Sequence, residues 1–96
     1  MDELEEMQKL LLKIPKGRVV SYKELARKLG IHPRTAARLL SRNPFPDRYP
    51  CYKVVCSDGR LGGYSGGLKE KKKRLEKDGI DIRNGGIDIK RFYHFS

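Results

Sequence analysis

Apolar residues recur every three or four positions near the N-terminus and predict a helix. They are Leu4, Met7, Leu11 and Ile14. This spacing places them on one face of an α-helix, and Asp2 and Glu5 form a capping box at its start. We therefore expect a first helix over residues of about 3–13, which the proline and glycine of segment 14–17 end.

Two shorter helices joined by a tight turn are predicted next. Ser21 and Glu24 form a second capping box, which opens a helix that Gly30 ends. Pro33 suits the first turn of a helix, so a third helix is expected over residues of about 34–41. Two helices connected in this way are typical of a helix-turn-helix.

The second half of the chain predicts a strand, a helix and a hairpin. The run 53–56 favours a strand, which lies between a loop at 42–46 and a turn at 57–60. Segment 68–78 favours a helix. Alternating apolar and polar residues around Asn84-Gly85-Gly86 predict a β-hairpin. We expect a mainly α fold with a small β component: a winged-helix-like domain with a helix-turn-helix and a C-terminal β-hairpin.

The length of the chain bounds its organisation. Its 96 residues suffice for one hydrophobic core, so we expect a single domain over 1–96, with 79–96 as a hairpin extension.

No apolar run is long enough to cross a bilayer, and the N-terminus is acidic where a signal peptide would be basic. We therefore expect a cytoplasmic monomer with no membrane partner, associated with the nucleoid if the source is prokaryotic.

Positive charge is concentrated in one part of the chain. Lys and Arg number 22 against 12 Asp and Glu, which gives a formal net charge of +10. Segment 16–42 holds eight of the basic residues and a single acid, Glu24. A basic face of this kind is the expected footprint of phosphate binding. For the second basic cluster, 69–77, phosphate binding and an ordinary solvated surface are equally open interpretations.

The two cysteines are predicted to be free thiols. Cys51 and Cys56 do not combine with His32 and His94 at the short paired spacings of a zinc site, so no metal is expected. A disulfide is not expected in a reducing compartment. Cys51 precedes a short apolar strand, and the glycine-rich segment 62–67 follows it with an aromatic ring and a hydroxyl. This arrangement predicts a pocket in which the thiol meets a flat ligand.

Five short motifs follow one another along residues 1–79. They are Ile14-Pro15-Lys16-Gly17-Arg18-Val19-Val20-Ser21-Tyr22, Pro33-Arg34, Asn43-Pro44-x-Pro46, Pro50-Cys51-x-x-Val54-Val55 and Gly63-Tyr64-Ser65-Gly66-Gly67-Leu68. In this order and spacing they resemble the C-terminal, DNA-binding and active-site domain of the O6-alkylguanine-DNA alkyltransferases, a family that includes the short alkyltransferase-like proteins. Five motifs in this order identify a family far more specifically than any one of them alone.

The resemblance implies that the third helix enters the minor groove and that the damaged nucleotide is flipped into a pocket. Arg34 matches the arginine that fills the vacated space in the base stack, which suits its planar, charged side chain. Tyr22 matches the tyrosine that faces the flipped guanine and a phosphate. Ala37 falls at a small position that permits close approach to DNA. The other expected DNA-binding residues are Arg38, Arg42 and Ser57.

The resemblance also makes Cys51 the alkyl acceptor. Attack of its thiolate on the alkyl carbon expels guanine and leaves a stable thioether, so each molecule reacts once and needs no cofactor. Asn43 matches the asparagine that braces the turn leading to the active-site loop, and Cys56 is expected in the core. The predicted base and alkyl pocket consists of Pro46, Val54, Tyr64 and Ser65. The expected partner is double-stranded DNA containing O6-alkylguanine.

Two residues depart from the family pattern. Tyr52 and Asp78 stand where the family has a histidine and a glutamate that are linked to the thiol through water. A phenol with a pKa near 10 is a poor base for a thiol with a pKa near 8.5, so we expect slower but surviving transfer. Tyr52 could still relay a hydrogen bond to Asp78, and Lys53 or a nearby helix end could lower the pKa of the thiol. A non-catalytic lesion-binding protein that signals to excision repair is the alternative, and a sequence-reading transcription factor a third. A separate repair protein as partner is left open.

Overall fold

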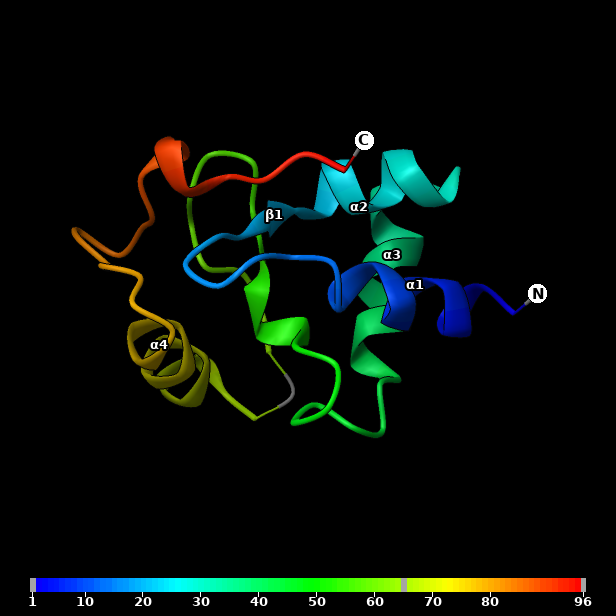
Figure 1. Cartoon of the computed structure of the whole chain (residues 1–96), viewed down its shortest axis with the longest axis horizontal. Coiled ribbons are helices and arrows are strands. Elements are labelled where there is room, and N and C mark those ends of the chain that lie inside the picture. The colour runs from blue at the N-terminus through cyan, green and yellow to red at the C-terminus, as the bar shows by residue number, and fades with distance from the viewer. Residues whose placement is uncertain (1, 65, 96) are drawn as a thin grey trace.

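Four α-helices and a two-stranded parallel sheet form the fold in the computed structural model, which describes residues 2–64 and 66–95 (Figure 1). The elements are α1 (Glu3–Leu11), β1 (Val20–Ser21), α2 (Tyr22–Leu29), α3 (Pro33–Ser41), the 3-10 turn η1 (Cys51–Lys53), β2 (Val54–Val55), α4 (Leu68–Lys77) and the 3-10 turn η2 (Ile89–Arg91). They confirm the predicted mainly α fold. Within the described part of the chain, no helix has the length and apolar character needed to span a bilayer.

The helix-turn-helix forms where the capping signals predict it. The Ser21 hydroxyl accepts a hydrogen bond from the Glu24 backbone N–H at 2.9 Å and so caps α2. Gly30 ends this helix in the left-handed conformation, with φ at 70°. His32 caps α3, because its Nδ1 accepts from the Arg34 N–H at 3.1 Å. Figure 1 shows α1 and α3 at the same end of the molecule as α2, with α4 at the other end.

The two strands separate two hydrophobic clusters. Val20 pairs with Val54 in the sheet, and both belong to the cluster that packs against α1, α2 and α3. Their neighbours Val19 and Val55 belong to the second cluster, which includes Leu75 of α4. Successive side chains of a strand point to opposite faces, so the four valines join the two clusters through one small sheet. The turn η1, which carries Cys51, leads directly into β2 at this junction.

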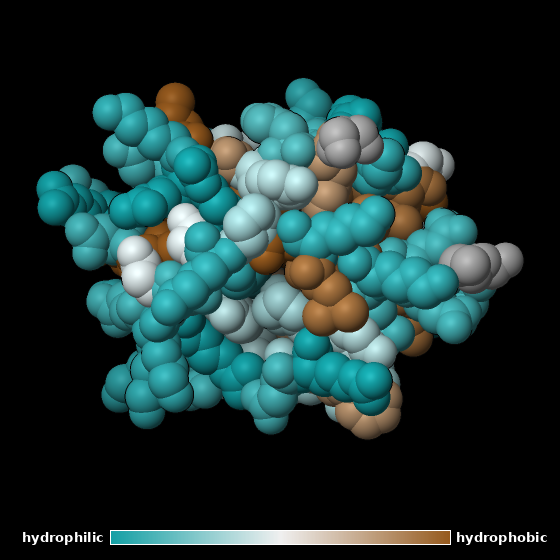
Figure 2. All heavy atoms as spheres, in the orientation of Figure 1, coloured by the Kyte–Doolittle hydropathy of each residue, from teal (hydrophilic) through white to brown (hydrophobic). Residues whose placement is uncertain are grey.

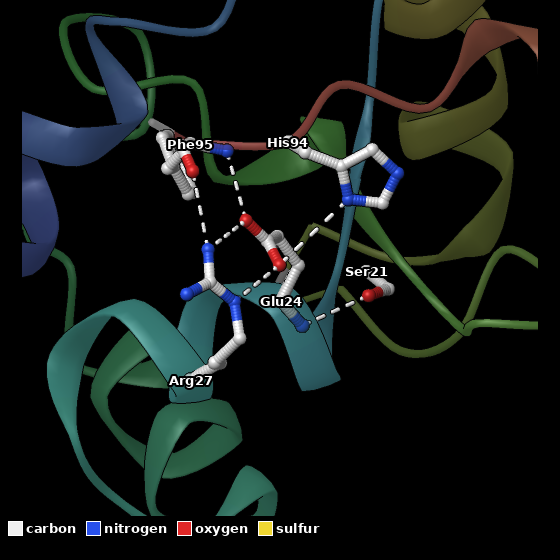
Figure 3. Close-up of polar contacts among 5 residues, drawn as sticks. All are labelled: Ser21, Glu24, Arg27, His94 and Phe95. Carbon is white, nitrogen blue, oxygen red and sulfur yellow. Dashed lines mark hydrogen bonds and ion pairs between the residues drawn. The ribbon is translucent and has the colours of Figure 1, made fainter.

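The C-terminal segment 92–95 extends the sheet and reaches α2. Tyr93 N–H donates to the Val19 carbonyl at 2.7 Å, and the Val19 N–H donates to Arg91 O at 2.9 Å. The Glu24 carboxylate then accepts the Phe95 N–H at 2.8 Å and pairs with Arg27 (Figure 3). Because Glu24 lies two residues after Tyr22, the C-terminal segment is tied to the start of the helix-turn-helix.

The predicted C-terminal β-hairpin is confined to its turn. Asn84 and Gly85 have φ of 53° and 75°, and Arg83 and Gly86 exchange two backbone hydrogen bonds around them. The paired strands do not continue, which corrects the predicted hairpin. Ile87 is buried in the second cluster, and its N–H donates instead to Gly59 O at 2.8 Å. Burial of this side chain directs the backbone toward the turn at 57–60.

We predict that Glu24→Gln weakens the acid sensitivity of the fold. The hydrogen bonds from Arg27 in particular lower the pKa of Glu24 from 4.5 to about 2, and the Phe95 N–H adds to this effect. A lowered pKa in the folded state gives stability that is present above about pH 4.5 and is lost as the pH falls toward about 2. Near pH 7, the variant should lose about 1–3 kcal/mol of unfolding free energy.

Urea unfolding at a series of pH values measures this effect. The wild-type free energy of unfolding should fall more steeply in acid than that of Glu24→Gln. Asp58→Asn is the control, because Asp58 also pairs with an arginine, Arg60, but both side chains are exposed. Parallel profiles for the wild type and Glu24→Gln would contradict the assigned role of Glu24.

Candidate active site

A cavity of about 500 Å³ lies between α3 and the glycine-rich segment, and Cys51 is one of its lining residues. Its lining residues are Tyr22, Ala37, Leu40, Ser41, Cys51, Cys56, Gly62, Gly63 and Tyr64. They come from the start of α2, the second half of α3, the segment around β2 and the glycine-rich segment. The fold therefore brings together four residues that the sequence analysis assigned to the site: Cys51, Tyr22, Ala37 and Tyr64.

The loop 43–50 places Cys51 in this cavity. The Asn43 side chain spans the loop, since its amide nitrogen donates to Tyr49 O at 2.9 Å and its oxygen accepts the Phe45 N–H at 3.2 Å. The Cys51 N–H donates to the same Tyr49 carbonyl at 2.7 Å. Cys51 itself is 6% exposed. The loop thus holds the thiol at the cavity wall, largely shielded from solvent.

The glycine-rich segment lets the Tyr22 ring approach the chain closely. The Tyr22 hydroxyl donates to Gly63 O at 3.3 Å. A Cβ at Gly62 would lie 2.9 Å from the Tyr22 hydroxyl, and Gly62 has φ of +74°, which side-chain-bearing residues rarely adopt. Burial raises the pKa of Tyr22, and the sulfurs of Cys56 and Cys51 add to this rise. Tyr22 therefore stays a neutral hydrogen-bond donor at the cavity wall.

Lys71 is a site residue that the sequence analysis missed. Its side chain is 0% exposed, and its Nζ donates to Val54 O at 2.7 Å and to Gly63 O at 3.1 Å. The ammonium also lies 5.7 Å from the centre of the Tyr22 ring. Burial lowers the pKa of Lys71 to about 8, while Cys56 and Cys51 act in the opposite direction. A buried cation thus stands directly behind residues that line the cavity.

The lysine-rich composition of α4 concealed this residue. Lys71 lies in the run 69–73, where its neighbours Lys69, Lys72 and Lys73 are exposed. Its spacing from Leu75 could have predicted that Lys71 is buried, because residues four apart share one helix face and Leu75 is apolar. That face of α4 is the buried one.

Tyr52 and Asp78 do not form the expected relay to the thiol. Both line a separate surface pocket with Asp47, and no hydrogen bond joins them within the described residues. The Asp78 carboxylate accepts the Gly17 N–H at 2.9 Å and pairs with Lys53 Nζ at 3.0 Å. Lys53 is buried and therefore requires an anionic partner, which explains why Asp78 is engaged there. Lys53 thus points to Asp78 rather than assisting the thiol.

Tyr52 nevertheless lies close enough to Asp78 to sense its charge. Burial raises the pKa of Tyr52, and the Asp78 carboxylate raises it further. The phenol is therefore an even weaker acid here than in solution, and it stays protonated and neutral near pH 7.

Several other expected site residues lie apart from the cavity. Pro46 and Val54 do not line it, and Val54 is fully buried with its carbonyl bonded to Lys71. Cys56, expected in the core, is half-buried and lines the cavity instead. Ser57 is exposed in another groove, beside Lys23 and His94. Ser65 lies outside the described residues.

The basic side chains of α3 and of its C-cap residue, Arg42, face solvent. Arg34, Arg38 and Arg42 are exposed, as is Ala37, which lies between them and also lines the cavity. Among the described residues, no group of three or more His, Cys, Asp and Glu side chains is arranged to hold a metal ion.

We predict that Gly62→Ala destabilises the fold, whereas Gly63→Ala does not. The new methyl group at position 62 meets Tyr22 at 2.9 Å and forces a side-chain-bearing residue to a φ of +74°. No atom lies within 4 Å of a Cβ at Gly63. Urea unfolding should show a loss of about 1–3 kcal/mol for the first variant and under about 0.5 kcal/mol for the second. Equal stabilities would show that Tyr22 does not need this glycine.

Comparison with known proteins identifies relatives over most of the chain. The family model for the 6-O-methylguanine DNA methyltransferase, DNA binding domain, matches residues 4–80. A bifunctional methyltransferase/endonuclease of Picrophilus torridus is 52% identical over 85 residues, which make up 86% of this chain and 28% of that protein. A methylated-DNA–protein-cysteine methyltransferase of Methanothermobacter thermautotrophicus is 51% identical over 69 residues, or 72% of this chain and 39% of that protein. The chain therefore spans well under half the length of these two relatives.

A solved structure agrees with this relationship. The crystal structure of Mycobacterium tuberculosis OGT in complex with DNA matches with a TM-score of 0.77 at 33% identity and covers 82% of this chain and 49% of that chain. These matches confirm the resemblance found in the sequence. The chain belongs to the 6-O-methylguanine DNA methyltransferase family, and residues 4–80 form the DNA-binding domain of that family.

Proposed function

We propose that this chain binds double-stranded DNA through the minor groove, flips O6-alkylguanine and transfers the alkyl group irreversibly to Cys51. The observation that carries the proposal is the Cys51 thiol in the wall of a cavity of about 500 Å³, a size suited to a small flat ligand. The Mycobacterium tuberculosis relative, solved in complex with DNA, supports DNA as the partner.

The position of α3 supports entry of a flipped base from the DNA. Ala37 and Ser41 line the cavity and are exposed on the same helix as Arg34 and Arg38, which are also exposed, and the exposed Arg42 follows at the end of this helix. A protein that holds phosphates beside the mouth of a pocket can position an extruded nucleotide over it. Arg34, at the start of α3, is the residue we assign to the vacated space in the base stack.

The proposed transfer is a direct displacement. The sulfur of Cys51 forms a bond to the alkyl carbon while the bond from that carbon to O6 breaks, and the electron pair of this bond stays with guanine. The thiol gives up one proton and the departing guanine takes up one, so no metal or redox partner is needed. The Lys71 ammonium, behind the cavity wall, favours negative charge on the sulfur as it develops.

A second candidate function is lesion binding without transfer, followed by excision repair. The observation that favours it is the placement of Tyr52 and Asp78. Neither residue lines the cavity. Within the described residues, the thiol therefore has no neighbouring base that is hydrogen-bonded to a carboxylate. In that case the same cavity would hold the flipped base, and Cys51 would stay unmodified.

Intact-mass measurement after incubation with a duplex that contains O6-methylguanine separates the two functions. We expect the wild-type chain to gain one methyl group and Cys51→Ala to gain none. Cys56→Ser, which alters the other thiol of the same cavity, should keep the gain. Tight binding of the lesion with an unchanged mass would favour the second candidate, and equal affinity for undamaged DNA would count against both.

Lys71→Met should slow transfer in a pH-dependent way. The wild-type lysine carries its charge below its pKa of about 8 and loses it above. We therefore expect an about tenfold lower rate for the variant near pH 7, and a difference that narrows as the pH rises past 8. Single-turnover rates measured between about pH 6 and 10 test this, with urea unfolding as a check that the variant folds.

Lys72→Met is the matched control, because Lys72 is the exposed neighbour of Lys71 on the same helix. It should leave the rate and its pH profile unchanged. A constant ratio of wild-type to Lys71→Met rates across the whole range would show that the charge of Lys71 does not act on the reaction.

A further inference from the structure

A second groove, of about 360 Å³, adjoins the cavity that Cys51 lines. It is formed by the start of α2, the turn after β2 and the C-terminal segment 92–95, and its polar lining residues include Lys23, Arg27, Ser57 and His94. Lys23 follows Tyr22 in the chain, and Ser57 follows Cys56. Tyr22 and Cys56 line the Cys51 cavity. The groove and the cavity are therefore built from neighbouring residues of the same two segments.

The C-terminal segment provides one wall of this groove. Phe92 and His94 line it. The segment runs beside β1 to the start of α2, where the Phe95 N–H donates to the Glu24 carboxylate at 2.8 Å (Figure 1). The family model ends at residue 80, so this wall lies outside the matched domain. Any contact that it makes with a ligand is additional to those of the matched residues.

The groove carries a net positive charge. Lys23 and Arg27 are exposed, and within the described residues Glu24 is the one acid that lines the groove. Its carboxylate is 8% exposed and accepts hydrogen bonds from Arg27 Nε and Nη2 at 2.9 and 2.8 Å, besides that from the Phe95 N–H. Glu24 is therefore neutralised within the protein, while the charge of Lys23 remains available to a ligand.

His94 adds a hydrogen-bond donor to this charge. Its side chain is 75% exposed, and its Nδ1 lies 3.8 Å from Glu24 Oε1. Figure 3 shows the other ring nitrogen of His94 directed away from Glu24. Ser57, on the same groove, is also exposed and carries a hydroxyl. An ammonium, an imidazole and a hydroxyl form a donor set that suits the oxygens of a phosphate.

We propose that this groove holds a backbone phosphate of the bound DNA and that His94, from the C-terminal segment, is one of its ligands. We call it the phosphate groove. The inference rests on the DNA binding of the proposed function, because a strand that delivers a base to the cavity passes the residues beside it. The contact reads no base, so it tightens binding to damaged and undamaged duplexes alike.

The test measures how affinity depends on salt in a Cys51→Ser background, which binds without transfer. Equilibrium binding is measured between about 50 and 200 mM salt for two otherwise identical duplexes that contain guanine or O6-methylguanine. Lys23→Met removes one charge from a phosphate, so the slope of log affinity against log salt should become shallower by about 0.9. His94→Ala removes a donor and should weaken binding of both duplexes by about two- to tenfold.

His94→Lys tests the position of the C-terminal segment directly. A fixed cation beside a phosphate should make the slope steeper by about 0.9 than in the background protein. Lys69→Met is the matched control for Lys23→Met, because Lys69 is also exposed but lies on α4, at the other end of the molecule from α2. Figure 2 shows hydrophilic side chains over this part of the surface. The control should leave the slope unchanged, and urea unfolding checks that each variant folds.

The outcomes distinguish the phosphate groove from the proposed function. Unchanged binding in both His94 variants overturns the role of the C-terminal segment, even where Lys23→Met weakens binding. An equal change of slope in Lys69→Met overturns the groove as a local site. In both cases a preference for O6-methylguanine over guanine leaves the proposed function intact. Equal affinity for the two duplexes, with the groove variants weakened as expected, counts against the proposed function and supports the groove.

Discussion

The buried ammonium of Lys71 is the constraint around which the site is arranged. A cation without access to solvent must be satisfied by acceptors, and here the backbone carbonyls of Val54 and Gly63 supply them. These two bonds join α4 to the strand that follows Cys51 and to the glycine-rich segment. The same interaction therefore ties the glycine-rich wall of the cavity to α4 and to the strand after Cys51, and it places positive charge behind that wall.

A second buried charge secures the other side of the cavity. The Glu24 carboxylate holds both Arg27 and the C-terminal segment, and it lies in the first turn of the helix that begins with Tyr22. A segment beyond the matched residues 4–80 thus supports the start of the helix-turn-helix. By holding the start of α2 in place, this arrangement also holds the Tyr22 ring against the glycine-rich segment.

The departures at positions 52 and 78 change what the domain can use for catalysis. Asp78 pairs with the buried Lys53 and with the Gly17 N–H, so its charge stabilises the turn at 15–17. In the transfer that we propose, activation of the thiol depends on the charge of Lys71 behind the cavity wall rather than on an adjoining base. The protein of Picrophilus torridus, a bifunctional methyltransferase/endonuclease that is 52% identical over 85 residues, shows that a closely related domain occurs together with an endonuclease activity.

The sequence by itself determined the elements and the thiol, because capping residues, helical periodicity and turn residues act locally. Ser21, Gly30 and Pro33 place two helices within a residue of their observed ends, and Asn84-Gly85 forms its turn. Only the tertiary structure decided which side chains share the cavity. Lys71 looks like one lysine among many until α4 packs, Asp78 pairs with Lys53, and burial of Ile87 prevents the hairpin. These outcomes depend on contacts between distant segments, which local patterns do not encode.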